Sequence, residues 1–220
     1  MTKKFIFIPV VNNFHLLEKA IGSVPVGLFD DYFIFNNSKG PIPIDTKQFT
    51  VITKERRYTF CETQNEMRDY ALKNDYDYYC FMHNDGEIGD DTAFRLLEKA
   101  DELISKNVKW SVIFTHYDVF CAYSSRCVKE IGEWGDLSWP KAQQTGYYLD
   151  NDYYRRMELS LYRTIQLENT NVLHNEASNT IKNKDELALW ESQRKDVENH
   201  YIQKWGGLGG KEIFTIPFGF

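Results

Sequence analysis

Short apolar runs alternate with amphipathic stretches along the first 125 residues. The run KFIFIPVV, at 4–11, is almost continuously hydrophobic, as expected of a strand covered on both faces. In the next stretch, 13–24, hydrophobic positions recur three and four residues apart, which predicts a helix. The same patterns predict further strands at 31–37, 49–53, 77–85 and within 110–124, and helices at 59–74 and 90–107. This alternation predicts βαβ units and a mixed, mostly parallel sheet flanked by helices.

The pattern changes after residue 125, where loops containing glycine and tryptophan separate fewer elements. A helix is predicted to begin near Asn151 or Asp152, and a strand followed by a polar loop occupies 169–181. A long helix at 184–205 and a glycine-rich tail close the chain. Because no repeat or low-complexity linker interrupts it, we predict a single α/β domain over 1–220.

Polar side chains follow several of the predicted strands. They are Asn12 and Asn13 after the first strand, Asn36 and Asn37 at the end of the second, and His83, Asn84 and Asp85 at the end of the fourth. Open α/β sheets bind ligands beyond the carboxyl ends of their strands. We therefore expect these side chains to gather around a binding crevice.

Composition limits the classes of partner and compartment. The net charge of -6 argues against a nucleic-acid partner, because such binding depends on phosphate neutralisation by Lys and Arg. The 4 cysteines have no C-x-x-C spacing and are interpreted as buried thiols of a reducing compartment, which predicts a cytoplasmic location. No apolar run approaches the ~20 residues of a membrane span.

The stretch FMHNDGEI, at 81–88, is the candidate metal site. Asp85 supplies the oxygen ligand that Mg²⁺ or Mn²⁺ prefers, and the imidazole of His83 favours Mn²⁺. The alternative is structural: Asp85 and Gly86 form a turn, and His83 is a core histidine with its hydrogen bonds satisfied.

Six segments in order resemble the GT-A-fold glycosyltransferases, in particular the inverting family 2 type. They are IPVVNNFHLLEKAIGSV, FIFNNS, TQNEMRDYA, FMHNDGEI at the place of the DXD metal motif, GYYLDNDYYRRM, and VLHNEAS. The resemblance covers about residues 4 to 180. The HYIQKWGG ending is similar to that of small capsid-glycan glycosyltransferases of large algal viruses, for which the location would be the host cytoplasm.

The resemblance implies a metal-dependent, inverting transfer of a sugar from a nucleoside-diphosphate donor, expected to be a UDP-sugar, to a glycan or glycoprotein hydroxyl. Residues 1–125 would bind the nucleotide-sugar, and residues 126–220 would bind the acceptor and supply the catalytic base and a C-terminal flap. Metal ligands would be Asp85 and His174, and the catalytic carboxylates Asp150 and Asp152. Donor-binding residues would be Pro9, Val10, Asn12, Asn36, Asn37, Asn65, His83, Asn84 and Lys204.

Two positions depart from the family pattern. His83 stands where the motif has its first Asp, and Leu149 stands where the later acidic pair has Glu. These departures leave open which of Asp150 and Asp152 is the base. They also leave a non-catalytic nucleotide- or carbohydrate-binding module as an alternative function. A sugar nucleotidyltransferase is the other alternative, although the chain lacks the glycine-rich basic loop expected after the first strand.

Overall fold

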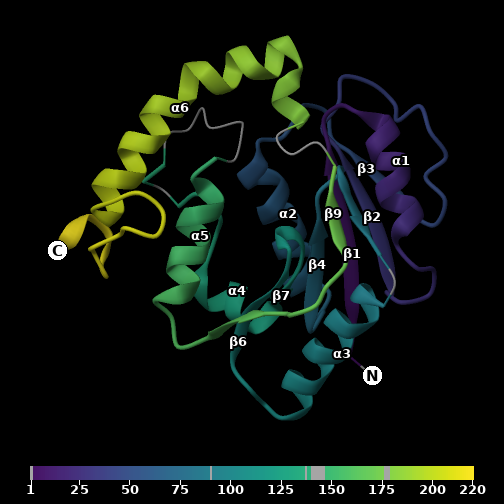
Figure 1. Cartoon of the computed structure of the whole chain (residues 1–220), viewed down its shortest axis with the longest axis horizontal. Helices are drawn as coiled ribbons and strands as arrows, with labels where there is room; N and C mark the ends of the chain where they lie inside the picture. The colour runs from purple at the N-terminus through teal and green to yellow at the C-terminus, as the bar shows by residue number, and fades with distance from the viewer. Residues whose placement is uncertain (1, 90, 137, 140–146, 176–178) are drawn as a thin grey trace.

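Within the residues that the computed structural model describes (2–89, 91–136, 138–139, 147–175 and 179–220), a seven-stranded sheet lies at the centre of the molecule (Figure 1). Its strand order is β3-β2-β1-β4-β7-β6-β8. In chain order these strands are β1 (Lys4–Val10), β2 (Asp31–Asn36), β3 (Thr50–Thr53), β4 (Tyr78–Met82), β6 (Trp110–Thr115), β7 (Tyr117–Ser124) and β8 (Arg163–Gln166). A separate two-stranded sheet pairs β5 (Gly86–Ile88) with β9 (Val172–His174).

The central sheet is mostly parallel. β1 pairs in parallel with β2 and β4, β2 with β3, and β6 with β8, whereas β7 is antiparallel to both β4 and β6. The chain builds outward from β1 through β2 and β3, and then returns to the other side of β1 with β4. A ligand crevice is expected at this reversal of strand order, beyond the carboxyl ends of β1 and β4.

Helices cover both faces of the sheet. They are α1 (Phe14–Ser23), α2 (Phe60–Lys73), α3 (Thr92–Ser105), α4 (Ser125–Ile131), α5 (Leu149–Glu158) and α6 (Lys184–Trp205), with short 3-10 turns η1 (Asn179–Lys182) and η2 (Pro217–Gly219). Successive side chains of a strand point to opposite faces. Accordingly, Ile6 and Ile8 of β1 pack with α1 and α3, whereas Phe5 and Phe7 pack with α2, α4 and α5.

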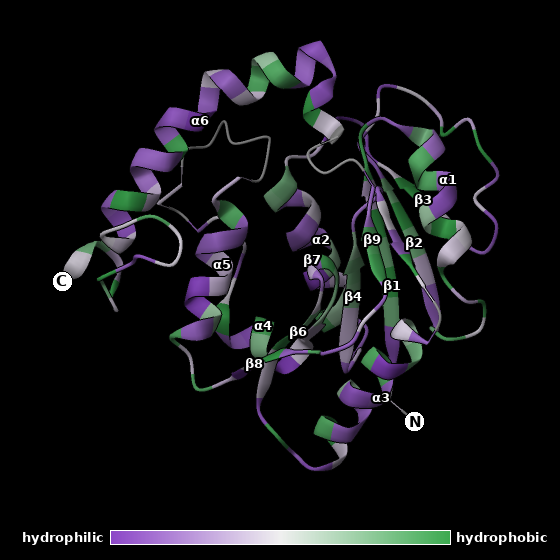
Figure 2. Ribbon diagram, in the orientation of Figure 1, coloured by the Kyte–Doolittle hydropathy of each residue, from purple (hydrophilic) through white to green (hydrophobic). Residues whose placement is uncertain are grey.

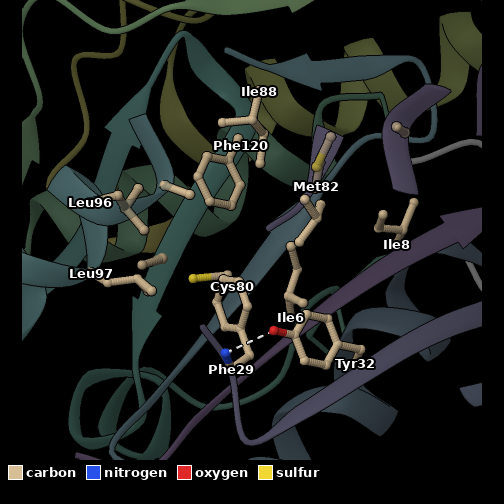
Figure 3. Packing of buried hydrophobic residues seen from close by; sticks show 14 of the residues in the cluster. Ile6, Ile8, Phe29, Tyr32, Cys80, Met82, Ile88, Leu96, Leu97 and Phe120 are labelled. Atoms are coloured by element: carbon tan, nitrogen blue, oxygen red, sulfur yellow. Dashed lines mark hydrogen bonds between the residues drawn. The ribbon is translucent and has the colours of Figure 1, made fainter. Parts of the chain in front are cut away.

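Figure 3 shows the first of these two cores, where Ile6 and Met82 from neighbouring strands lie in one cluster with Leu96 of α3 and Phe120 of β7. The colouring of Figure 2 agrees with this arrangement: β1 and β2 are mostly hydrophobic, whereas α6 is mostly hydrophilic. The predicted α/β architecture is thus confirmed, because two-sided burial is what the continuous apolar runs required.

Several local boundaries differ from expectation. The stretch 110–124 forms two strands, because Tyr117 adopts a left-handed backbone (φ 48°) that reverses the chain between β6 and β7. Helix α5 begins at Leu149, after a left-handed Tyr148 (φ 64°), so Asp152 lies inside its first turn and is not its cap. Asp91 precedes α3 without a side-chain cap bond, and position 90 lies outside the described residues.

Two features of the structure concern the predicted thiols and the predicted lack of a membrane span. All four cysteines are free thiols, three of them buried and Cys61 half-buried. In the part of the chain that the structure describes, no helix combines the length and the apolar character needed to cross a bilayer.

Candidate metal and catalytic site

A cavity of about 320 Å³ lies at the reversal of strand order, beyond β1 and β4. It brings together residues from the two strand ends, the loop before α2, the start of α5 and the end of β9. The predicted site residues that line it are Pro9, Asn37, His83, Asn84, Asp85, Asp150 and His174.

Two histidines and one aspartate form a compact cluster in this cavity. Among the described residues, His83, Asp85 and His174 each offer a ligand atom within 4.8 Å of the other two. Asp85 Oδ1 lies 3.7 Å from His83 Nδ1 and 3.3 Å from His174 Nε2. Ligand atoms held at about 2.1 Å from one ion lie roughly 3 to 4 Å apart, so the cluster fits a single divalent cation.

The cluster depends on strand pairing between distant parts of the chain. β9 pairs antiparallel with β5, which sets His174 opposite Gly86, the residue after Asp85. The backbone N–H of Asn175 also donates to the carbonyl of Asp85 at 2.7 Å. A Cβ at Gly86 would lie only 2.9 Å from Val119 Cγ1, so glycine allows β5 to lie this close to β7.

Asp150 places a further carboxylate in the cavity, outside the histidine-aspartate cluster. Its Oδ1 atom is inaccessible and has no hydrogen-bond partner among the described residues, and its Oδ2 accepts from the hydroxyl of Tyr117 at 3.4 Å. Burial and the neighbouring charge of Asp118 raise the pKa of Asp150 to about 7. A carboxylate with such a pKa can take up a proton near neutral pH.

Asp118 is a buried carboxylate that the sequence analysis did not single out. It lines the same cavity, is only 5% exposed, and lies 3.5 Å from His83 Nε2. Burial by itself lowers the pKa of His83, but the interaction with Asp118 and the charges of Asp85 and Asp150 outweigh it and raise that pKa.

A cation also faces the cavity from the loop before α2. Arg57 donates two hydrogen bonds to Glu186 in the first turn of α6, at 2.6 and 2.9 Å. Both residues line the cavity, and Arg57 Nε is buried without a partner. The sequence alone does not predict this ion pair, because two residues so far apart in the chain have no local pattern.

Several predicted donor-binding residues lie outside the cavity lining. Val10 is 1% exposed and belongs to the core. The amide of Asn12 bonds Thr180 of η1, and that of Asn36 bonds the loop at Gly40. Asn65 makes two hydrogen bonds to the backbone of Trp134 at 3.0 and 2.8 Å. These amides connect loops to the sheet and to α2.

Asp152 and Lys204 also lie outside the cavity lining. Both are buried, and Lys204 Nζ lies 2.8 Å from Asp152 Oδ1 and 2.5 Å from Asp136 Oδ2. Asp152 further accepts hydrogen bonds from Arg156 and from the indole of Trp205. The two residues therefore form an ion network between α5 and α6.

The glycine-rich tail, predicted as a flap, folds back on the end of α6. The backbone N–H groups of Ile213 and Phe214 donate to the carbonyl of Trp205, and Arg155 of α5 donates to the carbonyl of Phe214. No residue of 204–220 lines the cavity. Of the aromatic residues in the second half of the chain, Trp134 stacks on Tyr153 in the core, whereas Tyr147 lines the cavity.

Some signals for the missed residues were present in the sequence. Asp118 interrupts the apolar stretch YDVFCAYS, and a charged residue inside such a run is costly unless it has a partner or a role. Arg57 belongs to the adjacent pair Arg56-Arg57, and adjacent arginines in a loop are commonly solvated. Arg56 fits this pattern, because it is exposed and pairs with Glu62, but Arg57 does not.

The sequence matches no protein-family model and no curated protein. Solved structures do match. The mannosyltransferase PcManGT from Pyrobaculum calidifontis, in complex with GDP-Man and Mn²⁺, has a TM-score of 0.53 at 11% identity, over 76% of this chain and 55% of its own. GalNAc-T7, with UDP, GalNAc and Mn²⁺, has a TM-score of 0.60 at 9% identity, over 92% of this chain and 50% of its own. S. aureus TarS 1-349 has a TM-score of 0.55 at 10% identity, over 91% and 72%.

The chain spans about half of the length of the first two structures. At these identities the likeness concerns the fold and not the activity. The chain therefore has the GT-A glycosyltransferase fold, with a histidine-aspartate cluster and a buried carboxylate in the crevice of its sheet.

Proposed function

We propose that the protein is a metal-dependent, inverting glycosyltransferase that moves a sugar from a nucleoside-diphosphate donor, a UDP-sugar, to a glycan hydroxyl. One observation carries the proposal: a two-histidine, one-carboxylate cluster shares a cavity with a carboxylate whose pKa is near neutral. The resemblance to family 2 and to the algal-virus enzymes is consistent with this proposal. That resemblance and the cytoplasmic location remain predictions.

His83, Asp85 and His174 would hold the cation. Two imidazoles with one carboxylate favour Mn²⁺ over Mg²⁺, which prefers oxygen ligands alone. When bound, the cation would neutralise the charge that develops on the departing diphosphate. The structures of PcManGT and GalNAc-T7 both contain Mn²⁺, which supports this choice.

The donor nucleotide would bind against the first half of the chain. Pro9 and Val11 at the end of β1, with Tyr58 and Phe60 before and at the start of α2, give the cavity an apolar and aromatic wall. Such a wall suits a base and ribose, which bind largely by stacking and apolar contact. Arg57 is the residue placed to meet negative charge on this side.

Asp150 would act as the general base. The acceptor hydroxyl oxygen forms a bond to the anomeric carbon while the bond from that carbon to the diphosphate oxygen breaks. The electron pair leaves with the diphosphate, and the hydroxyl proton passes to Asp150. Asp150 lines the cavity as a carboxylate that can take up this proton, and the hydroxyl of Tyr117 contacts its Oδ2 atom.

The acceptor would approach from the second half of the chain. Tyr147, which precedes α5, lines the cavity and packs against Trp190 of α6 with ring centroids 5.5 Å apart. Tyr117, which contacts Asp150, is 51% exposed. Aromatic faces of this kind provide platforms for sugar rings, so we assign the acceptor side to Tyr117 and Tyr147.

Two variants and one control test the proposal. UDP affinity is measured by calorimetry with and without Mn²⁺, and turnover is measured as UDP release from a panel of UDP-sugars. Wild type is expected to bind UDP tightly only with Mn²⁺. In Asp85→Asn, Mn²⁺ is expected no longer to increase the UDP affinity. Asp150→Asn should keep UDP affinity while turnover falls by about 10²-fold or more, the usual scale for a lost base. The exposed Asp196→Asn on α6 should match wild type.

Other results would point elsewhere. If the UDP affinity were the same with and without Mn²⁺, and the same in wild type and Asp85→Asn, the proposed metal site would be wrong. Metal-dependent binding without turnover of any donor would favour a non-catalytic binding module. Pyrophosphate release from a nucleoside triphosphate and a sugar phosphate would indicate a nucleotidyltransferase.

A further inference from the structure

The role of Asp118 is not explained by the proposed reaction alone. Its carboxylate is buried at the start of β7, beside the metal cluster but outside the set of three ligand atoms that lie within 4.8 Å of one another in the described chain. Its Oδ1 lies 3.5 Å from His83 Nε2, and its Oδ2 accepts a hydrogen bond from Tyr154 at 3.2 Å. A carboxylate buried to this degree requires partners.

His83 has a different carboxylate at each of its ring nitrogens. Nδ1 faces Asp85 at 3.7 Å, and Nε2 faces Asp118 at 3.5 Å. An imidazole nitrogen that coordinates a cation must be unprotonated, so the ring proton then resides on the other nitrogen. With Nδ1 toward the cluster, that proton lies on Nε2 and points at Asp118.

We propose that Asp118 is a positioning residue for His83: it accepts a hydrogen bond from Nε2–H and thereby presents Nδ1 to a divalent cation held with Asp85 and His174. The inference rests on the proposed metal site. It explains how a histidine can serve at the position where the family motif has an aspartate. This chain has no carboxylate at that position, and Asp118 supplies one from β7, on the far side of the ring.

The surroundings of Asp118 are rigid enough for this role. β7 pairs with β4 up to the residue before His83, and the backbone N–H of His83 donates to the carbonyl of Val119 at 2.9 Å. Tyr154 of α5, which bonds Asp118, has its own hydroxyl 2.8 Å from that of Tyr123. Ligand-orienting carboxylates held in this way typically contribute 10- to 100-fold to metal affinity.

The test measures Mn²⁺ affinity of the protein without nucleotide, by the electron paramagnetic resonance signal of free Mn²⁺. Asp118→Ala is expected to weaken Mn²⁺ binding by about 10- to 100-fold, and Asp118→Asn by less, because the amide oxygen can still accept a hydrogen bond from Nε2–H. Should Asp118→Ala fail to fold, Asp118→Asn still reports the effect. Urea unfolding confirms that each variant is folded.

A double-mutant cycle distinguishes positioning from a simple loss of negative charge. If Asp118 acts through His83, Asp118→Ala should have no further effect on Mn²⁺ affinity in a His83→Ala background. An equal loss in both backgrounds would overturn the inference, because charge alone acts whether or not the ring is present. Unchanged affinity in both Asp118 variants would also overturn it.

The Asp85→Asn variant distinguishes a failure of the proposed metal site from a failure of the proposed role of Asp118. Loss of Mn²⁺ binding in Asp85→Asn with normal binding in the Asp118 variants would leave the proposed metal site standing and reject only the role of Asp118. A wild-type protein that binds no Mn²⁺ would reject both.

Discussion

At the scale of the residue, Asp150 shows that a single side chain can be suited to chemistry at the expense of stability. The hydroxyl of Tyr117 contacts its carboxylate, whereas burial and the charge of Asp118 disfavour its charged form. The pKa of about 7 in the folded state lies well above that of an aspartate in an unfolded chain. Ionised Asp150 therefore opposes folding.

This linkage predicts that Asp150→Asn stabilises the protein at alkaline pH. Because the folded-state pKa is raised, wild type is least penalised below the unfolded-state pKa near 4 and loses stability as the pH rises through about 7. At about pH 8 we expect the free energy of unfolding of Asp150→Asn to exceed that of wild type by on the order of 1 to 3 kcal/mol, and the difference to shrink toward about pH 4.

Urea unfolding of both proteins at the two pH values measures this difference. The exposed Asp196→Asn serves as the matched control and should show little pH-dependent difference from wild type. A difference between Asp150→Asn and wild type that is the same at both pH values would show that Asp150 ionises normally in the folded protein.

At the scale of the element, a buried ion network joins α5 to α6. Lys204 is 1% exposed and contacts Asp136 and Asp152, and Asp152 also accepts from Arg156 and Trp205. Asp152 lies two residues after Asp150, in the first turn of α5. Its contacts with α6 therefore fix this turn and, with it, the candidate base Asp150. The acidic pair of the sequence thus has one member in the cavity and one in the network.

Lys204→Met should destabilise the fold by on the order of 3 kcal/mol, because it leaves buried Asp152 short of a cation that offsets its desolvation. Affinity for UDP with Mn²⁺ should stay close to wild type, because Lys204 does not line the cavity. Urea unfolding and calorimetry measure the two effects, with the exposed Lys195→Met as control. Normal stability together with lost UDP affinity would instead return Lys204 to the donor-binding role.

At the scale of the whole molecule, the metal cluster links the two parts of the chain. His83 and Asp85 follow β4, whereas His174 ends β9, and the β5–β9 pairing brings them together. The division into a donor half and an acceptor half, which remains a proposal, is therefore bridged at the metal site. A cation bound there would stabilise the fold as well as support the reaction.

Mn²⁺ at about 100 times its dissociation constant should raise the unfolding temperature of wild type by roughly 5 to 10 °C, because binding to the native state alone contributes about 2.7 kcal/mol. His174→Ala should lose most of this increase, whereas the exposed His15→Ala on α1 should retain it. Differential scanning calorimetry with Mn²⁺ or chelator measures the shift. A full increase in His174→Ala would exclude β9 from the metal site.

The chain's own periodicity was sufficient to predict β1 to β4 and most of the helices, but it predicted neither β8 nor α4 and did not divide 110–124 into two strands. Continuous apolar runs such as 4–11 and 77–82 require burial on both faces, and α2 even has the capping box between Thr59 and Glu62 expected at a helix start. The boundaries that differed, at Tyr117 and Tyr148, depend on left-handed backbone conformations of non-glycine residues. Such conformations are imposed by packing around them and not by local preference.

The sequence by itself determined strands β1 to β4 and the placement of His83, Asn84 and Asp85 at a strand end, because apolar runs and polar strand ends are properties of neighbouring residues. Only the tertiary structure decided which other groups join them. Asp118 and the Arg57–Glu186 pair reach the cavity through strand pairing and helix packing across long separations, as does His174, which the family resemblance had named. Asp152 and Lys204 are instead buried between two helices. Contacts between residues far apart in the chain depend on the whole fold, and no local pattern records them.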